Sequence, residues 1–164
     1  MKDAGAMTRV LFVCLGNICR SPTAHGVFAA LVERHGLAQS IEVDSCGTGG
    51  WHVGEPPDRR ATLEAGARGY DLRPLRARQL RTDDFRRFDY ILAMDASNLA
   101  DLQAARPTGF SGHLGLFLEF APARREREVP DPYYGGDEGF AHVLDLVEEA
   151  SQGLLREIRL APAD

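Results

Sequence analysis

Cys14 and Arg20 begin and end one short loop, Cys14-Leu15-Gly16-Asn17-Ile18-Cys19-Arg20, in which a thiol and a guanidinium could act on the same ligand. The loop follows the apolar run 10–13, which is typical of a buried parallel strand, and it precedes Ser21-Pro22, a pair that favours a helix N-cap and first helical position. The N–H groups of such a loop converge at the positive end of a helix, where a phosphate dianion binds well. A cysteine in that field can be a thiolate at neutral pH and therefore a nucleophile, and the planar fork of Arg20 matches two phosphoryl oxygens.

The context of this loop makes the prediction specific. The spacing from cysteine to arginine is by itself a weak signal in a chain with 19 Lys and Arg residues. Gly16 permits backbone angles that are closed to other residues, and Asn17 is among the few other types that tolerate a left-handed conformation. The alternative interpretation is that Cys14 is a small buried side chain at the end of a strand, as many free cysteines are.

The loop resembles the signature loop of the low-molecular-weight protein tyrosine phosphatases, and later motifs resemble that family in the same order. These motifs are Asp44-Ser45-Cys46-Gly47-Thr48, Ala77-Arg78-Gln79, Met94-Asp95 with Asn98, and Asp131-Pro132-Tyr133-Tyr134. The resemblance covers nearly the whole chain. It implies an α/β fold, a flavodoxin-like three-layer sandwich in which a central parallel sheet of about four strands is flanked by helices. It also implies a metal-independent phosphoric monoester hydrolase that acts on phosphotyrosine and needs no cofactor.

Asp131 is the candidate general acid of that reaction. A phosphate ester needs its leaving oxygen protonated as the P–O bond breaks, and the prolines on either side of Asp131 could fix the aim of its carboxyl. An aspartate between prolines is usually only a turn residue, and the family resemblance is what favours the catalytic role. Burial beside a bound dianion should keep this carboxyl protonated. Trp51, Tyr133 and Tyr134 are expected to wall a slot for a flat aromatic ring, the alternative being ordinary packing.

The expected mechanism consists of two displacements through a phosphocysteine. The Cys14 thiolate attacks phosphorus while Asp131 protonates the departing phenol oxygen, and Asp131 then takes a proton from the water that hydrolyses the phosphocysteine. The loop N–H groups and Arg20 stabilise the charge on the equatorial oxygens. The other loop residues expected around the phosphate are Leu15, Gly16, Asn17, Ile18, Cys19 and Ser21.

Hydrogen bonds around the loop should tune the nucleophile. The Ser21 hydroxyl can donate to the Cys14 sulfur, and Asn17 should pin the loop through its side chain, with Ser45 as an outer hydrogen-bond partner. The family usually carries a histidine shortly before its Ala-Arg-Gln, where this chain has Leu75. We therefore expect the thiolate to be somewhat less stabilised here than in the rest of the family.

Cys19 and Cys46 bear on two further kinds of thiol chemistry. Cys19 is close enough to Cys14 that a sulfenic acid on Cys14 could be captured as a reversible disulfide, although a plain loop side chain is the alternative. Related enzymes on this fold reduce arsenate with a relay of thiols, but no cysteine follows Cys46 in this chain. A phosphotyrosine reader without catalysis is the other rival. It would have lost the nucleophile or the acid, and both are present.

Length, composition and charge limit the remaining classes of function. The 164 residues suit a single domain, expected over residues 7–164 after a flexible extension over residues 1–6. A net charge of -5 argues against nucleic-acid binding, and no spacing of histidines and cysteines fits a metal site. The apolar runs are too short for a membrane span or a signal peptide.

Three cysteines, an odd number, fit a reducing compartment better than a disulfide framework. A cytoplasmic location is therefore expected, with export by a signal-free route left open. The expected partner is a tyrosine-phosphorylated protein, for example a cognate tyrosine kinase. Inorganic phosphate or another oxyanion should also enter the site.

Apolar and helical segments alternate along the chain, as in a parallel sheet covered by helices. Strands are expected at 9–13, 41–44, 90–94 and 114–118, and helices at 22–35, 57–69, 96–105 and 138–160. The last helix repeats apolar residues at spacings of three and four and should close one face of the sheet. The site should lie at the C-terminal ends of the strands, where Cys14 is expected. Two long loops are also expected, at 47–57 and 121–136. A basic run is typical of solvated surface: Arg73, Arg76, Arg78 and Arg81.

Overall fold

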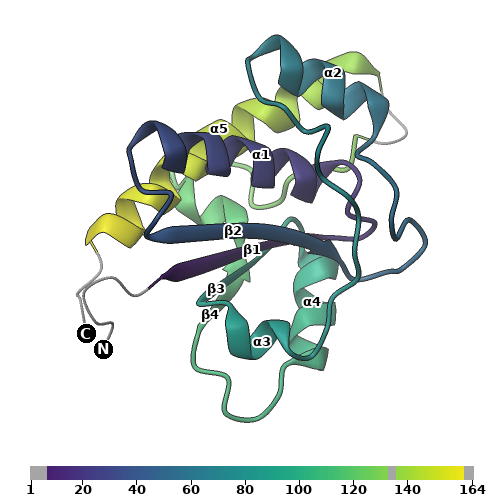
Figure 1. Ribbon diagram of the computed structural model, residues 1–164. Coiled ribbons are helices and arrows are strands. Elements are labelled where there is room, and N and C mark those ends of the chain that lie inside the picture. The colour runs from purple at the N-terminus through teal and green to yellow at the C-terminus, as the bar shows by residue number, and fades with distance from the viewer. Residues whose placement is uncertain (1–6, 133–135, 161–164) are drawn as a thin grey trace.

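Four parallel strands form the centre of the fold, in the order β2-β1-β3-β4 (Figure 1). The computed structural model describes residues 7–132 and 136–160. The strands are β1 (Thr8–Cys14), β2 (Ile41–Gly47), β3 (Tyr90–Ala93) and β4 (His113–Leu116). Residues 10–13 of β1 are fully buried, as expected of an inner strand covered on both faces. The predicted flavodoxin-like α/β sandwich is confirmed.

Helices cover both faces of this sheet (Figure 1). One face carries α1 (Arg20–Arg34), α2 (Arg59–Ala67) and α5 (Asp137–Leu160). The other face carries α3 (Asp84–Arg87) and α4 (Ala96–Ala105). The chain runs from β1 to β2 on one side and later places β3 on the other side of β1. The strand order therefore reverses between β1 and β3, which is where ligands bind in open sheets of this kind.

Alternation along β1 divides the core into two clusters. Val10 and Phe12 pack in the cluster beneath α1 and α5, together with Cys14. Val13 packs in the cluster on the opposite face, together with Cys46. Because successive side chains of a strand point to opposite faces, the thiols of Cys14 and Cys46 lie on different sides of the sheet.

The predicted elements are largely confirmed, and two differences concern secondary structure. The expected strand 114–118 ends at Leu116, and the chain continues as a 3-10 turn, η1 (Phe117–Phe120). The helix α3 spans only Asp84–Arg87, which is too short to give a hydrophobic period in the sequence.

The start of α1 differs from the prediction in a way that matters for the site. The helix begins at Arg20, so Ser21 is not its N-cap and Pro22 is not its first residue. Pro22 is still tolerated because the N–H groups of the first helical turn have no partner within the helix. The Ser21 hydroxyl contacts Asn17 and Cys14 and does not cap the helix.

None of the helices within residues 7–132 and 136–160 is both long enough and apolar enough to cross a membrane. The extension expected over residues 1–6 lies outside the described residues. The single domain expected over 7–164 stays a prediction.

Candidate active site

A cavity of about 130 Å³ opens at the C-terminal end of β1. Its wall combines the end of β1, the loop that follows and the start of α1 with the loops after β2 and before α5. Most of the predicted site residues meet here, although they are far apart in sequence. The residues that line the cavity are Cys14, Leu15, Gly16, Ile18, Cys19, Arg20, Trp51, His52 and Asp131.

The carbonyl oxygens of the loop after β1 bond to neighbouring segments. The carbonyls of Cys14 and Leu15 accept from the amides of the residues that follow β2, and that of Ile18 accepts from the residue before α2. The bonds are Thr48 N to Cys14 O at 2.9 Å, Gly49 N to Leu15 O at 2.9 Å, and Asp58 N to Ile18 O at 2.7 Å. These bonds hold the loop's carbonyls outward, toward the segments that provide the donors.

The N–H groups of the same loop are left for a ligand. Within the part of the chain that the structure describes, no acceptor bonds to the amides of Leu15, Gly16, Ile18, Cys19 or Arg20. Ile18, Cys19 and Arg20 are buried residues, and buried amides without partners are rare in folded proteins. Several of them in one loop at a helix N-terminus form a concave site that binds anions.

The backbone conformation and the side chain of Asn17 both stabilise the loop. Its φ of 56° is left-handed, a conformation that asparagine tolerates better than most residues. In this conformation its backbone N–H donates to the Cys14 sulfur at 3.3 Å. Its side-chain Nδ2 donates to the Ser21 hydroxyl at 2.7 Å, and that hydroxyl lies 3.1 Å from the same sulfur. The sulfur of Cys14 is therefore contacted by two polar groups that can stabilise a negative charge.

Arg20 is buried, and its guanidinium is held by hydrogen bonds at one nitrogen, Nη1. Its Nη1 donates to Asp95 Oδ2 at 2.6 Å and to the carbonyl oxygen of Val129 at 3.1 Å. Burial alone would lower the pKa of Arg20, but the hydrogen bond to Asp95 and the charges of Cys14, Asp95 and Asp131 outweigh it and raise the pKa. Among the described residues none accepts a hydrogen bond from Nε of Arg20, so the Nε–Nη2 edge can face two oxygens of a ligand.

Asp131 reaches the cavity because the loop before α5 is anchored two residues earlier. The amide of Val129 donates to the carbonyl of Met94 at 2.7 Å, at the end of β3, and its carbonyl accepts from Arg20. The Asp131 carboxylate lies 3.7 Å from Nη2 of Arg20, and its side chain is 44% exposed. The structure therefore places the carboxyl at the mouth of the cavity, more exposed than the sequence suggested.

The rim of the cavity is partly aromatic. Trp51 is 71% exposed and lines the opening. His52 lies beside it, and its Nδ1 is 3.1 Å from the Glu55 carboxylate. A side chain at Gly16 would meet His52 at 3.0 Å, so the glycine allows the rim to approach the loop closely. Tyr133 and Tyr134, the other predicted walls of the slot, lie outside the described residues.

Ser45 and Leu75 have surroundings that the sequence did not predict. Asn17 Oδ1 accepts from the backbone amide of Arg78 at 3.0 Å, whereas the Ser45 hydroxyl bonds to His25 Nδ1 at 2.9 Å. Leu75 packs against the core. The outer role of Ser45 toward Asn17 stays a prediction, and the observed partners of the Asn17 side chain are Ser21 and Arg78.

The remaining thiols differ from Cys14 in their environment. Burial raises the pKa of the Cys19 thiol, and the Asp58 charge raises it further. Burial likewise raises the pKa of the Cys46 thiol, which lies on the other face of the sheet. Neither thiol is favoured as a thiolate.

Two residues of the site were missed by sequence reasoning. Asp95 was noticed only as part of a motif, yet its Oδ1 caps α4 through the amide of Asn98 at 2.8 Å while its Oδ2 holds Arg20. An aspartate directly before the predicted helix 96–105 is a helix N-cap signal, which could have drawn attention to it. For His52 the sequence offered no such signal.

Comparison with known proteins agrees with this geometry. Residues 9–161 match the family described as low molecular weight phosphotyrosine protein phosphatase. A family member from Schizosaccharomyces pombe is 46% identical over 151 residues, which cover 92% of this chain and 96% of the relative. A Streptomyces coelicolor low molecular weight protein-tyrosine-phosphatase is 46% identical over 154 residues, covering 92% and 93%. The crystal structure of a protein tyrosine phosphatase from Entamoeba histolytica with Hepes in the active site superposes with a TM-score of 0.89 at 38% identity, covering 93% of this chain and 97% of that one.

Proposed function

Because this chain belongs to the low molecular weight phosphotyrosine protein phosphatase family, we propose that Cys14, Arg20 and Asp131 are the residues with which it hydrolyses phosphotyrosine. The enzyme is a protein tyrosine phosphatase that works through a cysteine. The observation that carries the residue assignment is the loop from Cys14 to Arg20, in which five amides find no acceptor among the described residues. These amides offer an anion site beside the sulfur of Cys14.

In the first displacement, the Cys14 sulfur attacks phosphorus from below. Arg20 holds two equatorial oxygens with its Nε–Nη2 edge, and the loop amides bind the charge that the transition state spreads over these oxygens. Asp131 protonates the departing phenol oxygen from the open side of the cavity. The bond from phosphorus to oxygen breaks and a bond from phosphorus to sulfur forms.

In the second displacement, water replaces the phenol. Asp131, now a carboxylate, takes a proton from this water while the water oxygen attacks the phosphocysteine. The thiolate of Cys14 leaves, stabilised by the Ser21 hydroxyl and the Asn17 amide. Phosphate remains in the loop until it dissociates, so inorganic phosphate is expected to inhibit competitively.

Phosphorylated proteins are the substrates of this family, and its site binds oxyanions. The Hepes in the active site of the Entamoeba relative carries a sulfonate, which supports oxyanion binding in the loop of this chain. Trp51, with Tyr133 and Tyr134, would provide an aromatic wall that favours phosphotyrosine over phosphoserine. A tyrosine kinase that carries its own phosphotyrosine is the proposed physiological partner.

The two rival functions are less well supported. Arsenate reduction needs further thiols to regenerate Cys14, and Cys46 lies across the sheet from it. A phosphotyrosine reader would not need an acid at the cavity mouth, where Asp131 stands. A reduced Cys14 is required for turnover, which supports a reducing compartment such as the cytoplasm.

The residue assignment is tested by leaving-group dependence. Wild type, Cys14→Ser and Asp131→Asn are each assayed for hydrolysis of para-nitrophenyl phosphate and of aryl phosphates with poorer leaving groups. Cys14→Ser should be inactive on every ester. Asp131→Asn should lose most activity on the poorest leaving groups, because these depend most on protonation. Equal losses on all leaving groups would remove Asp131 from the role of proton donor.

A further inference from the structure

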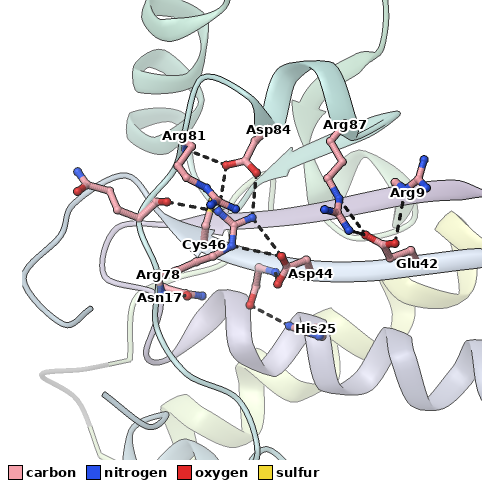
Figure 2. A network of polar contacts seen from close by, with 12 residues as sticks. Arg9, Asn17, His25, Glu42, Asp44, Cys46, Arg78, Arg81, Asp84 and Arg87 are labelled. Carbon is pink, nitrogen blue, oxygen red and sulfur yellow. Dashed lines mark hydrogen bonds and ion pairs between the residues drawn. The ribbon is translucent and has the colours of Figure 1, made fainter. Parts of the chain in front are cut away.

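Three charged side chains from separate segments meet beside the phosphate loop, and we name Asp44, Arg78 and Asp84 the Arg78 clamp (Figure 2). Nη1 and Nη2 of Arg78 donate to the two carboxylate oxygens of Asp84, both at 3.0 Å. Nε and Nη2 donate to Asp44 Oδ2 at 3.2 and 3.1 Å. Every nitrogen of the guanidinium is thus bonded, and its plane is fixed by two carboxylates.

The Arg78 clamp is partly removed from water. The side chain of Asp84 is 2% exposed and that of Arg78 is 23% exposed. Burial alone would lower the pKa of Arg78, but the hydrogen bond that it donates to Asp84 and the charges of the neighbouring Asp44 and Asp84 raise the pKa, so the guanidinium stays charged. A carboxylate as buried as Asp84 needs a cationic partner, and the short helix α3 begins at this residue.

The backbone of the same segment is tied to the end of β2. The carbonyl of Arg78 accepts from the amide of Gly47 at 2.9 Å, and the amide of Leu80 donates to the carbonyl of Gly47 at 2.8 Å. The clamp fixes the side chain of Arg78 and these bonds fix its main chain. As a result, the backbone N–H of Arg78 points at one target, Oδ1 of Asn17, at 3.0 Å.

That single amide decides how the Asn17 side chain is oriented. With Oδ1 occupied by the Arg78 amide, the Nδ2 donor must face Ser21, to which it donates at 2.7 Å. The Ser21 oxygen then accepts from Asn17, so its own proton must go to another acceptor. Two acceptors lie within reach: the Cys14 sulfur at 3.1 Å and the carbonyl oxygen of Cys46 at 3.4 Å. The sulfur is the nearer of the two, and as a thiolate it is the stronger acceptor. The Arg78 amide thus sets the direction of the bond from Asn17 to Ser21, and that bond leaves the Ser21 hydroxyl as a donor.

We propose that Arg78 is a positioning residue for the nucleophile: the Arg78 clamp holds the amide that orients Asn17, and Asn17 in turn makes Ser21 a donor to the Cys14 sulfur. Arg78 does not touch the substrate. The inference rests on the proposed function, since it assumes that Cys14 is the nucleophile. It also separates Arg78 from the exposed basic run in which the sequence placed it.

The experiment compares Arg78→Met and Arg78→Lys with the control Arg76→Met. Arg76 is exposed in the same segment and donates to the carbonyls of Arg73 and Leu75, not to a carboxylate. The first readout is the pH profile of Cys14 alkylation by iodoacetate, with the modified residue identified by mass spectrometry. The second is the split between kcat and KM for para-nitrophenyl phosphate, and the third is the melting temperature.

Arg78→Met should move the midpoint of alkylation upward by about one pH unit, the lower end of the effect of one hydrogen bond to a charged group, because Ser21 itself is still present. Its kcat should fall about 10-fold or more while KM changes little, because residues that orient a reacting group act mainly on the chemical step. Arg78→Lys keeps the charge without the planar fork and should lie between Arg78→Met and wild type. Arg76→Met should match wild type in every readout.

A lower melting temperature in Arg78→Met with an unchanged alkylation midpoint and unchanged kcat would overturn the proposal, because Arg78 would then only stabilise the fold. If Arg78→Met does not fold, Arg78→Lys decides by the same criteria. Alkylation does not require turnover. If the alkylation midpoint of Arg78→Met shifts upward as expected but no phosphocysteine can be trapped in wild type, the positioning role of Arg78 is supported and the proposed function is refuted.

Discussion

Replacing Ser21 with alanine removes one hydrogen bond from the Cys14 sulfur and leaves the backbone of α1 intact. The Ser21 oxygen lies 3.1 Å from the sulfur, and its residue is fully buried. A hydrogen bond to a charged group contributes about 1.5–3 kcal/mol. At about 1.36 kcal/mol per pH unit, its loss should raise the midpoint of Cys14 alkylation by ~1–2 pH units.

The assay is the rate of Cys14 alkylation by iodoacetate as a function of pH. The kcat of each variant is determined in parallel on untreated portions of the same preparations. Thr23→Val is the matched control. Thr23 is a buried hydroxyl residue of the same helix, and its Oγ1 donates to the carbonyl of Cys19 at 2.7 Å. This variant should leave the alkylation midpoint where wild type has it. Ser21→Ala should also lower kcat more than KM, because the serine assists the thiolate both as nucleophile and as leaving group.

The reasoning would be refuted by a Ser21→Ala enzyme whose alkylation profile superposes on that of wild type. Such a result would mean that the sulfur is stabilised by the loop amides alone. An equal shift in Thr23→Val would also count against it, because that shift would reflect a general loosening of α1.

Three further outcomes follow from contacts around the site. Asp95→Asn weakens the 2.6 Å bond to the loop arginine and should lower kcat/KM about 10-fold or more, with the exposed Asp101→Asn on α4 as the control that stays active. For His25, burial lowers the pKa below its usual 6.5, with the charge of Asp44 opposing the shift. Between that lowered pKa and 6.5 the unfolded chain binds a proton that the folded chain does not, so stability falls as the pH falls through this window. Urea unfolding at about pH 7 and about pH 5 should therefore show a smaller acid loss for His25→Asn than for wild type, and identical losses would contradict the assignment. Mild peroxide should link Cys14 to Cys19 reversibly, as seen by mass spectrometry before and after dithiothreitol, whereas overoxidised Cys14 with free Cys19 would argue against this protection.

The parts of the site that could be predicted from the sequence are contiguous in it. One continuous segment contains the buried strand, the loop from Cys14 to Arg20 and the helix that follows. The residue types of this segment indicate its structure without information from the rest of the chain. The alternation of elements also predicted the parallel sheet and placed Cys14 at the correct edge. Local signals therefore predicted most of the fold and the position of Cys14 at the candidate site.

The parts that could not be predicted depend on pairing between distant segments. Ser21 was expected to cap α1 because serine usually bonds locally, but here Asn17 and Cys14 compete for its hydroxyl. Arg78 is of the same residue type as its exposed neighbours in the sequence, and only the fold shows that it bonds to Asp84. A run of charged residues does not reveal which of its members is partly buried by the fold.

The most direct test of the account is rapid-quench analysis of a single turnover with an aryl phosphate. We predict a transient phosphoryl adduct on the peptide that contains Cys14, formed as fast as the phenol is released and decaying as phosphate appears. Cys14→Ser should show no adduct and no phenol release. Release of phenol and phosphate without any adduct on Cys14, or turnover by Cys14→Ser, would contradict the central claim.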